Sequence, residues 1–576
     1  MGAVLSIFDA PVLIAVVVAG LYFLRRLMLP KPIPNIPFNH DAASKTFGDV
    51  PELMGHVMRT KVVFGWLTSL TGRHQSPIAQ AFIKPMAQPW VVVTDPYEAQ
   101  DILLRRFKEF DRSGFFGELI GGILPEQHIQ FLSNDSRFKN NRNLINHLMA
   151  PTFVTQISGP RLYTAMSTMI RLWSLKCGIA KGHPFSAHSD LTYMALDTIF
   201  AGMFGHPEAD GITIQRVNAV QNMGDPVLPP DRSTPVSFPE SELPAIFSAA
   251  LTLAGSVMTT QLSPAPRPTS WVLRQLPYMK KATAIKDKYI RDKVEESLSL
   301  MAAGETETPR TALHSVLLRE RELAAKESRK PAYHSRAIAD EFFGFMLAGH
   351  DTAATTIAWG VKYLADHPAV QTRLRADLRA ALPAAAKEKR TPTYAELSKA
   401  QVPYLDAVVE EVLRHANTIA FVVRQTLKDT TVMGRMVPKG TDVFLMANGA
   451  GYLKPKISVS DKDRSPGARK SEGKALTGLW DDEDIEEFKP ERWLKKSEDG
   501  FEVFDPAAGP QLAFGLGPRA CFGKKFAMFG LKIQFALINW HFDLLDIPDE
   551  LGGYDAIQKF AQEPTKCFVR LREAAF

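Results

Sequence analysis

The segment 514–523 (FGLGPRACFG) restricts the folds open to this chain more than any other part of its sequence. Its cysteine, Cys521, directly precedes a stretch, 522–542, with the apolar spacing of one helical face. A cysteine at a helix amino terminus meets unpaired backbone N–H groups and the positive end of the helix dipole, which favour negative sulfur. Three basic side chains add positive potential: Arg519, Lys524 and Lys525. Because three glycines also leave room for a flat ligand, the segment predicts a thiolate that binds a heme iron.

The remaining composition excludes several other classes of site. The other cysteines, Cys177 and Cys567, lack such surroundings and are interpreted as small, inert hydrophobic residues. Three widely spaced cysteines in 576 residues argue against a disulfide framework and for a reducing compartment, and no Cys/His cluster has zinc spacing. The net charge of +6 comes without a dense Lys/Arg run with interleaved aromatics, so nucleic acid is not an expected partner.

The amino terminus carries a continuous apolar run, 11–24, which with its flanks nears the roughly 20 residues that span a bilayer. Arg25 and Arg26 follow this run and no basic residue precedes it, so the bulk of the chain is expected on the cytoplasmic side. A cleaved signal peptide would need a basic start and a small-residue cleavage site, and neither is evident. We therefore expect residues 1–29 to form a single-pass membrane anchor.

After the anchor, four prolines in residues 30–37 predict a stiff hinge over 30–40, and we expect 41–576 to form one catalytic domain. Helical periodicity dominates between about 95 and 420, for example in the stretches 96–110, 191–204, 284–301, 336–366, 370–382 and 402–415. The few short strand-like stretches are 90–93, 422–426 and 442–446. The fold class is therefore mainly α with small β-sheets. Residues 454–477 are charged and poor in apolar side chains, which predicts a surface insertion.

The segment around Cys521 resembles the heme-binding loop of the cytochrome P-450 (heme-thiolate) monooxygenases, F-x-x-G-x-R-x-C-x-G. All five fixed positions are present: Phe514, Gly517, Arg519, Cys521 and Gly523. The resemblance implies the cytochrome P-450 fold, here preceded by a single N-terminal transmembrane helix, with heme b (iron protoporphyrin IX) as the cofactor and Cys521 as the ligand of its iron. It also implies that Phe514, Arg519 and Gly523 contribute to cofactor binding.

Two further segments follow in the order found in that family. Glu411 and Arg414 fit its E-x-x-R motif, and their i, i+3 spacing places both side chains on one helix face. The stretch 488–493 (FKPERW) resembles the F-x-P-E-R-F segment, with Trp493 as the final aromatic residue. The resemblance implies that Arg492 joins Glu411 and Arg414 in a buried charged triad that braces the heme side of the core.

The stretch 348–352 (AGHDT), inside the helical pattern 336–366, resembles the oxygen-activation motif A-G-x-[D/E]-T. A threonine hydroxyl can bond the carbonyl four residues earlier, here that of Ala348, and a glycine weakens the helix, so a local groove is expected. Asp351 and Thr352 are then the expected catalytic acid and alcohol that relay protons. The alternative is a buried helix with an incidental threonine-rich run, and His350 is expected to be a satisfied or pore-facing histidine.

Heme propionates require cations, and the resemblance offers Arg142, Arg424 and Arg519. Arg142 lies in a stretch similar to W-x-x-x-R in which Phe138 replaces the tryptophan, and an ordinary surface ion pair is its alternative interpretation. Apolar stretches at 115–124, 342–347 and 419–423 fit a lipophilic substrate but equally well fit core packing.

The expected activity is insertion of one oxygen atom from O2 into a lipophilic small molecule, most simply a secondary-metabolite intermediate, at the endoplasmic reticulum membrane. Because the sequence has no flavin or nicotinamide domain, electrons are expected from NADPH through a separate NADPH-cytochrome reductase, docked on a basic face of Lys139, Arg142, Lys524 and Lys525. Two alternatives stay open: a heme-thiolate isomerase or dehydratase that needs no O2, and a membrane-tethered heme protein without turnover.

Overall fold

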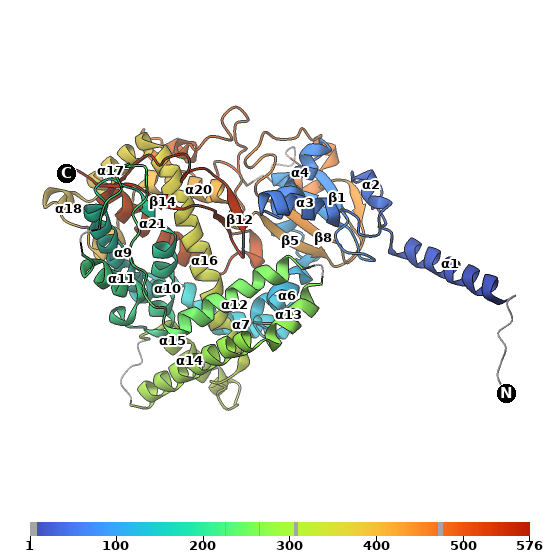
Figure 1. Ribbon diagram of the computed structural model, residues 1–576, viewed down its shortest axis with the longest axis horizontal. Helices are drawn as coiled ribbons and strands as arrows, with labels where there is room; N and C mark the ends of the chain where they lie inside the picture. The colour runs from blue at the N-terminus through green and yellow to red at the C-terminus, as the bar shows by residue number, and fades with distance from the viewer. Residues whose placement is uncertain (1–8, 225, 264, 304–308, 470–475) are drawn as a thin grey trace. The chain divides into compact units, whose positions relative to one another are not determined.

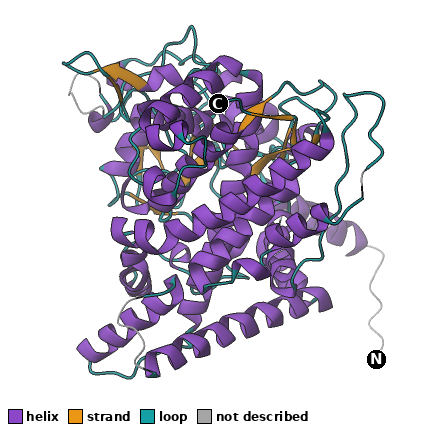
Figure 2. Cartoon of the chain, turned by 90° about the vertical axis from the view of Figure 1, so that its left-hand side faces the viewer, coloured by secondary structure: helices purple, strands orange, loops and turns teal. Residues whose placement is uncertain are grey.

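The computed structural model describes residues 9–224, 226–263, 265–303, 309–469 and 476–576, with side chains from Val12 onward. Helices make up most of it, and the strands are short, as Figure 2 shows. The predicted class, mainly α with small β-sheets, is confirmed. The chain divides into two compact units: one comprises the chain up to Asp111 with Phe421–Leu476, and the other comprises Arg112–Ala420 with Thr477–Phe576.

The first unit is built around a five-stranded sheet of order β1-β2-β8-β5-β3, in which β2 and β8 are parallel and the pairs β1–β2 and β5–β8 antiparallel. Its strands are β1 (Ile78–Ala81), β2 (Trp90–Val93), β3 (Phe110–Arg112), β5 (Phe421–Thr426) and β8 (Asp442–Met446), beside the hairpin β6 (Thr430–Val432) and β7 (Arg435–Val437). Its helices are α1 (Asp9–Met28), α2 (His40–Ala43), α3 (Val50–Thr60), α4 (Phe64–Arg73) and α5 (Pro96–Leu104). Every residue of β1 and β2 is buried, and all of them are apolar except Gln80 of β1.

The predicted membrane anchor, 1–29, begins in residues 1–8, which lie outside the described part. The helix α1 follows, and its side chains from Val12 to Leu24 are exposed. Within the described residues the structure contains no helix whose length and apolar character would let it traverse a bilayer. The predicted transmembrane span is therefore not found among the described residues.

The proline-rich segment predicted as a hinge is bound to the sheet of the first unit. The side-chain amide of Gln80 on β1 donates to the carbonyls of Ile33 (2.9 Å) and Ile36 (2.7 Å), and its oxygen accepts from the Ile33 amide (2.8 Å). Both isoleucines are buried, with 3% and 1% of their surface exposed. Because one buried glutamine satisfies three backbone groups, this segment has a defined position on β1.

Residues 454–469 and 476–477 are the described part of the predicted insertion, and they contain two short helical turns, Asp461–Asp463 and Pro466–Ala468. The guanidinium of Arg464 pairs with Asp95 (2.8 Å), at the start of α5. The amide of Ser465 donates to the buried Glu98 (3.0 Å). These charge-assisted bonds hold the described part of the insertion on α5. Residues 470–475 lie outside the described residues.

The second unit is a helical body that carries the long helix α16 (Arg336–Asp366) (Figure 1). Its other helices are α6 (Gly114–Ile120), α7 (Ser136–Ile145), α8 (Pro151–Phe153), α9 (Gly159–Ala180), α10 (His188–Phe204), α11 (Ile212–Gln221), α12 (Ala245–Gln261), α13 (Pro266–Gln275), α14 (Pro277–Ala302), α15 (Ala312–Lys326), α17 (Pro368–Ala381), α18 (Pro383–Lys387), α19 (Tyr394–Leu397), α20 (Pro403–Ala416) and α21 (Lys524–His541). Its strands form the pairs β4 (Phe185–Ser186) with β14 (Phe568–Val569), β9 (Leu494–Lys496) with β10 (Glu502–Phe504), β11 (Phe542–Leu544) with β15 (Leu571–Glu573), and β12 (Ala556–Gln558) with β13 (Gln562–Pro564).

The core of the second unit lies where α16 packs against α10, α20 and α21. Gly360 of α16 allows the closest of these approaches, because a Cβ atom at this position would lie 2.3 Å from the ring of Phe535 on α21. The fully buried residues Ile357, Val412 and Phe535 form the contact between the three helices α16, α20 and α21. This packing fixes α16 relative to α21, the helix that follows Cys521.

Candidate functional site

The loop before α21 has a conformation that its glycines make possible. Gly515 and Gly517 have φ angles of 62° and 73°, in the left-handed region that side chains disfavour. The Cys521 amide donates to the carbonyl of Phe514 (2.7 Å), which closes the loop. The helix begins at Lys524, two residues later than the apolar pattern predicts, so Cys521 lies just outside its amino terminus.

Cys521 is exposed to solvent, although neighbouring protein atoms also surround its thiol group. Burial raises the pKa of this thiol, while N–H groups of Gly523 and Lys524 and the charges of Lys524 and Arg142 act in the opposite direction. The N–H donors predicted for the helix start are therefore present, but they lower the pKa of the Cys521 thiol by less than burial raises it. Hence the site favours a neutral thiol by itself and a thiolate once a metal ion supplies positive charge.

The residue after the cysteine docks the loop between α7 and α16. The ring of Phe522 stacks on Phe345 of α16, with centroids 5.5 Å apart and planes 16° apart. On α7, the guanidinium of Arg142 lies 4.6 Å from the ring centroid of Phe522. Such a cation–π contact and the stacking together set the distance between Cys521 and α16.

The middle of α16 has the predicted hydroxyl bond. Thr352 donates through Oγ1 to the Ala348 carbonyl (2.7 Å), and the helix is continuous through this turn. Ala348 is exposed, although Met346 and Leu347 before it are buried. The helix is thus unbroken beside an exposed alanine, and the expected groove stays a prediction. His350 is buried and its Nδ1 bonds the Met346 carbonyl (2.6 Å), in agreement with a satisfied histidine.

Asp351 is engaged with a different element from Thr352. Its carboxylate accepts from the amide of Ala561 (3.1 Å), between β12 and β13. Within the described residues, no hydrogen bond links the side chains of Asp351 and Thr352. A proton relay between them would therefore need a bridging water, while Asp351 also fixes the hairpin beside α16.

Two of the three predicted propionate-binding arginines lie at this site. Arg142 contacts Phe522 as described, and burial lowers the pKa of its guanidinium, which the charges of Glu341 and Cys521 oppose. Arg519 donates through Nη2 to the Phe131 carbonyl (2.9 Å), and its guanidinium lies 4.0 Å from the ring centroid of Phe138. Phe138, which replaces the expected tryptophan, thus still contacts the site.

The third predicted arginine belongs to the first unit. Arg424 lies on β5, is 4% exposed, and donates through Nη1 to the carbonyl of Val423 (2.9 Å). A buried arginine on a strand requires a compensating anion or carbonyl groups, so its environment is compatible with an anion-binding role.

A buried polar cluster that the sequence did not reveal joins α7 to α16. Glu341 is fully buried and accepts from the backbone amide of His128 (2.6 Å) and from the Asn141 side chain (3.0 Å). Its other oxygen bonds His128 Nδ1 (2.7 Å). Because these partners lie about 200 positions apart in sequence, no local motif marks them. They position the helix that carries Arg142.

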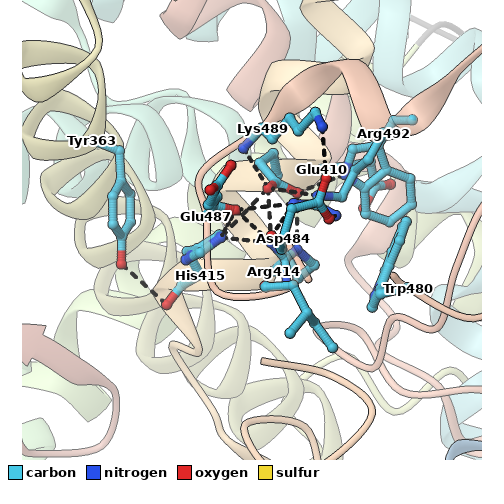
Figure 3. Close-up of polar contacts among 12 residues, drawn as sticks. Tyr363, Glu410, Arg414, His415, Trp480, Asp484, Glu487, Lys489 and Arg492 are labelled. Carbon is cyan, nitrogen blue, oxygen red and sulfur yellow. Dashed lines mark hydrogen bonds and ion pairs between the residues drawn. The ribbon is translucent and has the colours of Figure 1, made fainter. Parts of the chain in front are cut away.

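The predicted charged triad is present and is larger than expected; Figure 3 labels its two arginines, Arg414 and Arg492. Glu411 accepts from Arg414 Nη2 (2.8 Å) and Nε (2.9 Å) and from Arg492 Nε (3.1 Å), and it is fully buried. Trp493 adds an indole N–H at 2.9 Å, and the Lys489 amide adds another donor at 2.8 Å. The aromatic residue at position 493 therefore contributes a hydrogen bond as well as packing.

The residues of the second unit have the properties that a heme requires. The Cys521 sulfur is accessible, Ala348 leaves space on α16, and two arginines flank the cysteine loop. Gly523 has nothing within 4 Å of the position that a Cβ atom would take, so the backbone leaves room here for a flat ring. This arrangement can present a sulfur ligand to an iron and cations to the carboxylates of the ring.

Comparison with known proteins agrees with this geometry. The family model "Cytochrome P450" matches residues 74–453 and 479–562. Relatives include the cytochrome P450 monooxygenase TRI13 of Fusarium sporotrichioides, 33% identical over 97% of this chain and 98% of that protein. Another is the cytochrome P450 monooxygenase GME11363 of Pestalotiopsis microspora, 35% identical over 97% of each chain.

Among solved structures, the cytochrome P450DA heme domain is similar with a TM-score of 0.66 and 18% identity, over 95% of this chain and 99% of that one. A cytochrome P450 described as CYP102L1 is similar with a TM-score of 0.65 and 17% identity. These structures support the fold, and the full-length relatives extend the likeness to sequence. The resemblance seen in the loop around Cys521 is thus confirmed, and the chain belongs to the cytochrome P450 family.

Proposed function

We propose that this P450 monooxygenase inserts one oxygen atom from O2 into a lipophilic intermediate of secondary metabolism, with heme b bound through Cys521 and electrons from NADPH through a separate reductase. The observation that carries the proposal is the Cys521 sulfur, which is accessible, receives two N–H groups from the start of α21 and lies beside Arg142. The fungal relatives named as monooxygenases support the assignment to secondary metabolism.

The bound heme would supply oxygen activation, and the chain's own residues would control its surroundings. Cys521 would hold the iron, and Arg142 and Arg519 would neutralise the propionates. Phe514 would shield the sulfur; the Lys524 ammonium lies 5.7 Å from its ring centroid.

On α16, Thr352 and Asp351 would supply the catalytic protons. The Thr352 hydroxyl donates to the carbonyl of Ala348, and this leaves its oxygen able to accept a hydrogen bond from water beside the exposed alanine. Asp351 would exchange protons with such a water. The hydrogen bond that its carboxylate accepts from the Ala561 amide would hold the hairpin of β12 and β13.

The exposed apolar side chains of α1 support a location at the endoplasmic reticulum membrane, with the catalytic body on the cytoplasmic side. Residues Val12–Leu24 are exposed and Arg25 and Arg26 follow directly, which suits contact with a bilayer and its anionic surface. We propose that α1 holds the chain at the membrane from which a lipophilic substrate would enter.

The test begins with a comparison of the metabolites of the source organism with and without the gene, which identifies the accumulating precursor. The purified heme-loaded protein is then incubated with that precursor, a reductase, NADPH and labelled O2. We expect a product that carries one labelled oxygen atom and forms only when all components are present. Product formation without NADPH and O2 would contradict the proposal and favour an isomerase or dehydratase.

The basic face near the cysteine loop gives a second prediction, on electron delivery. Lys139 of α7 and Lys525 of α21 are exposed. If an acidic reductase docks there, the double variant Lys139→Glu/Lys525→Glu should slow heme reduction roughly tenfold at low salt, and less at high salt, because steering by surface charge is screened. Stopped-flow reduction measures the rate. Lys524 is left unchanged because its positive charge acts to lower the pKa of the Cys521 thiol.

The matched control is Lys281→Glu/Lys326→Glu, which reverses the same number of exposed charges on α14 and α15. This control should reduce at the wild-type rate. Equal rates for the two double variants would contradict docking on the face that contains Lys139 and Lys525.

A further inference from the structure

A hollow of about 460 Å³ opens in the second unit where α9, α10 and α11 pack against one another (Figure 1). Its lining contains no residue of the cysteine loop and none of 342–352. On α10 it is lined by Asp197 and Ala201, which are one turn apart. Ile199 lies between them in sequence and faces α16, because a Cβ atom at Gly349 would lie 2.7 Å from its side chain. The hollow is therefore on the face of α10 that points away from α16.

One end of the hollow has a cation without an acidic partner. Arg161 lies in the first turn of α9 and lines the hollow. Its guanidinium donates through Nη1 to the carbonyl of Ile157 (2.9 Å) and through Nη2 to that of Arg310 (2.5 Å). Within the described residues Arg161 forms no ion pair, and burial lowers the pKa of its guanidinium. Two carbonyls thus hold the guanidinium in place, and its remaining N–H groups are available to an anion.

The other end of the hollow is acidic and lies two turns further along α9. Glu208 is exposed, and its carboxylate accepts from the hydroxyl of Thr168 (2.5 Å), which is 6% exposed. Glu208 too forms no ion pair in the part of the chain that the structure describes. Thr168 follows Arg161 by seven positions on α9, so the two charged ends are roughly 10 Å apart along one helix face.

A second carboxylate and a buried hydroxyl complete the acidic end. Asp197 accepts from the backbone amides of Ile212 (3.0 Å) and Thr213 (2.8 Å), so it caps α11. A Cβ atom at Gly211 would lie 3.1 Å from the Glu208 carbonyl and 3.2 Å from the Asp197 carboxyl group, so these two residues are neighbours. Thr213 lines the hollow and is 1% exposed, and its hydroxyl has no hydrogen-bond partner among the described residues. Because such a hydroxyl is costly, a ligand that donates to it would gain affinity.

The remaining walls of the hollow are mainly apolar and come from all three helices. Ala165 of α9, Ala201 of α10 and Ile214 of α11 contribute to them, together with Pro160 and Pro207. The volume is within the range of small-molecule sites, and apolar walls with a few polar groups at defined places are typical of such sites.

We propose that this hollow binds a small zwitterion, with a carboxylate that pairs with Arg161, a cationic group that pairs with Glu208 and an apolar chain that lies on the walls between them. A ligand with one charged end leaves either Arg161 or Glu208 without a partner, whereas a zwitterion pairs with both. N–H groups of the cation also reach the Thr213 hydroxyl. The site is separate from the oxidation site, and none of its residues takes part in the proposed reaction.

The test uses the full-length, heme-loaded protein and three probes with the same hexanoyl chain in isothermal titration calorimetry. 6-Guanidinohexanoate has both charges, hexanoate lacks the cation, and 6-guanidinohexanamide lacks the anion. A guanidinium keeps its proton and is therefore no ligand for an iron. We expect wild type to bind 6-guanidinohexanoate about fivefold more tightly than either other probe, because each of these forms one ion pair fewer.

Two single variants should give a crossed pattern. Arg161→Gln should weaken binding of the two probes with a carboxylate about fivefold and leave 6-guanidinohexanamide unchanged. Glu208→Gln, which can still accept from Thr168, should weaken binding of the two guanidinium probes by a similar factor and leave hexanoate unchanged. The matched controls Arg171→Gln and Glu242→Gln remove the same charges from exposed residues outside the lining, and they should bind all three probes like wild type.

The variant Arg161→Lys retains the positive charge and should restore binding of hexanoate. Failure of 6-guanidinohexanoate to bind, or equal affinity of wild type for the three probes, would overturn the proposal. An effect of Arg161→Gln that is equally large on 6-guanidinohexanamide would also overturn it, because this probe has no carboxylate. The heme absorption spectrum is recorded in the same titrations, and a spectral change that follows the calorimetric binding would place the probe at the heme and equally count against the site.

Discussion

Replacement of Cys521 by serine is expected to abolish the thiolate-type band in the reduced carbon-monoxide difference spectrum and to lower monooxygenase activity at least about a hundredfold. Changing a residue that only hydrogen-bonds a metal ligand already lowers metal affinity or activity about 10–100-fold. Loss of the ligand itself should therefore lower the activity by no less. Serine keeps the size of the side chain and accepts the N–H groups of Gly523 and Lys524. Its oxygen, however, lacks the soft, electron-donating character of a thiolate.

The fold should survive this substitution, which makes the result interpretable. The Cys521 amide bonds Phe514 through the backbone, and α21 begins only at Lys524. Far-ultraviolet circular dichroism should therefore match that of wild type. A variant that retains the thiolate-type band would disprove Cys521 as the ligand.

Cys177→Ser is the matched control, because it makes the same change at a thiol that is expected to be inert. The Cys177 sulfur lies 3.3 Å from the Leu571 carbonyl, and burial raises the pKa of this thiol. Burial also raises the pKa of Cys567 to about 12. Unlike Cys521, neither of these two cysteines is exposed, so Cys177→Ser should retain both the band and the activity. If it lost the band, the contrast among the three cysteines would be wrong.

The parts of the fold that are visible in the sequence are those in which local pattern and burial agree. The bounds predicted from periodicity for β2, β8 and α16 coincide with the structure. These segments have strong signals, because β2 is apolar on both faces and α16 is bounded by the cap of Ser335 and by Pro368. By contrast, no bounds were predicted for α9 and α12, which lie in the region expected to be mostly helical.

The candidate site shows the same division. The loop conformation around Cys521 and the Thr352 bond follow from residues that are close in sequence. The contacts of Glu341 with His128, and of Asp351 with Ala561, join residues about 210 positions apart. Such pairs depend on tertiary packing, and a single sequence contains no local signal for them. The bond between Trp493 and Glu411 was missed for this reason, although both residues were singled out.

The buried charged cluster gives the largest expected effect on stability. Burial alone would raise the pKa of Glu411, but hydrogen bonds from Arg414 and the neighbouring His415 outweigh it and hold the pKa well below its usual range. The guanidiniums of Arg414 and Arg492 each lie 5.6 Å from the Trp480 ring centroid, so both are enclosed (Figure 3). Glu411→Gln leaves these two cations without their shared carboxylate. We expect it to lower the free energy of unfolding by about 3–5 kcal/mol, because a buried charge loses its partner.

The sign of the pH dependence follows from the lowered pKa of Glu411. A group whose pKa is lower in the folded state stabilises fully above its unfolded value, here 4.5, and loses this contribution as the pH falls below that value. The difference in unfolding free energy between wild type and Glu411→Gln, measured by urea unfolding, should therefore be constant above about pH 5 and shrink toward lower pH. A difference that grew toward acid would contradict the ionised state of Glu411.

The adjacent glutamate on α20 supplies a control of opposite sign. Burial raises the pKa of Glu410 to about 7, against the weaker attraction of Lys524. A raised pKa means that ionisation of Glu410 costs stability as the pH rises from 4.5 toward 7, and glutamine resembles the protonated form. Glu410→Gln should therefore leave the stability unchanged at about pH 4, below the unfolded value, and increase it at pH 8. Two neighbouring glutamates on one helix would then respond to the same substitution in opposite directions, because only Glu411 has the two arginines as partners.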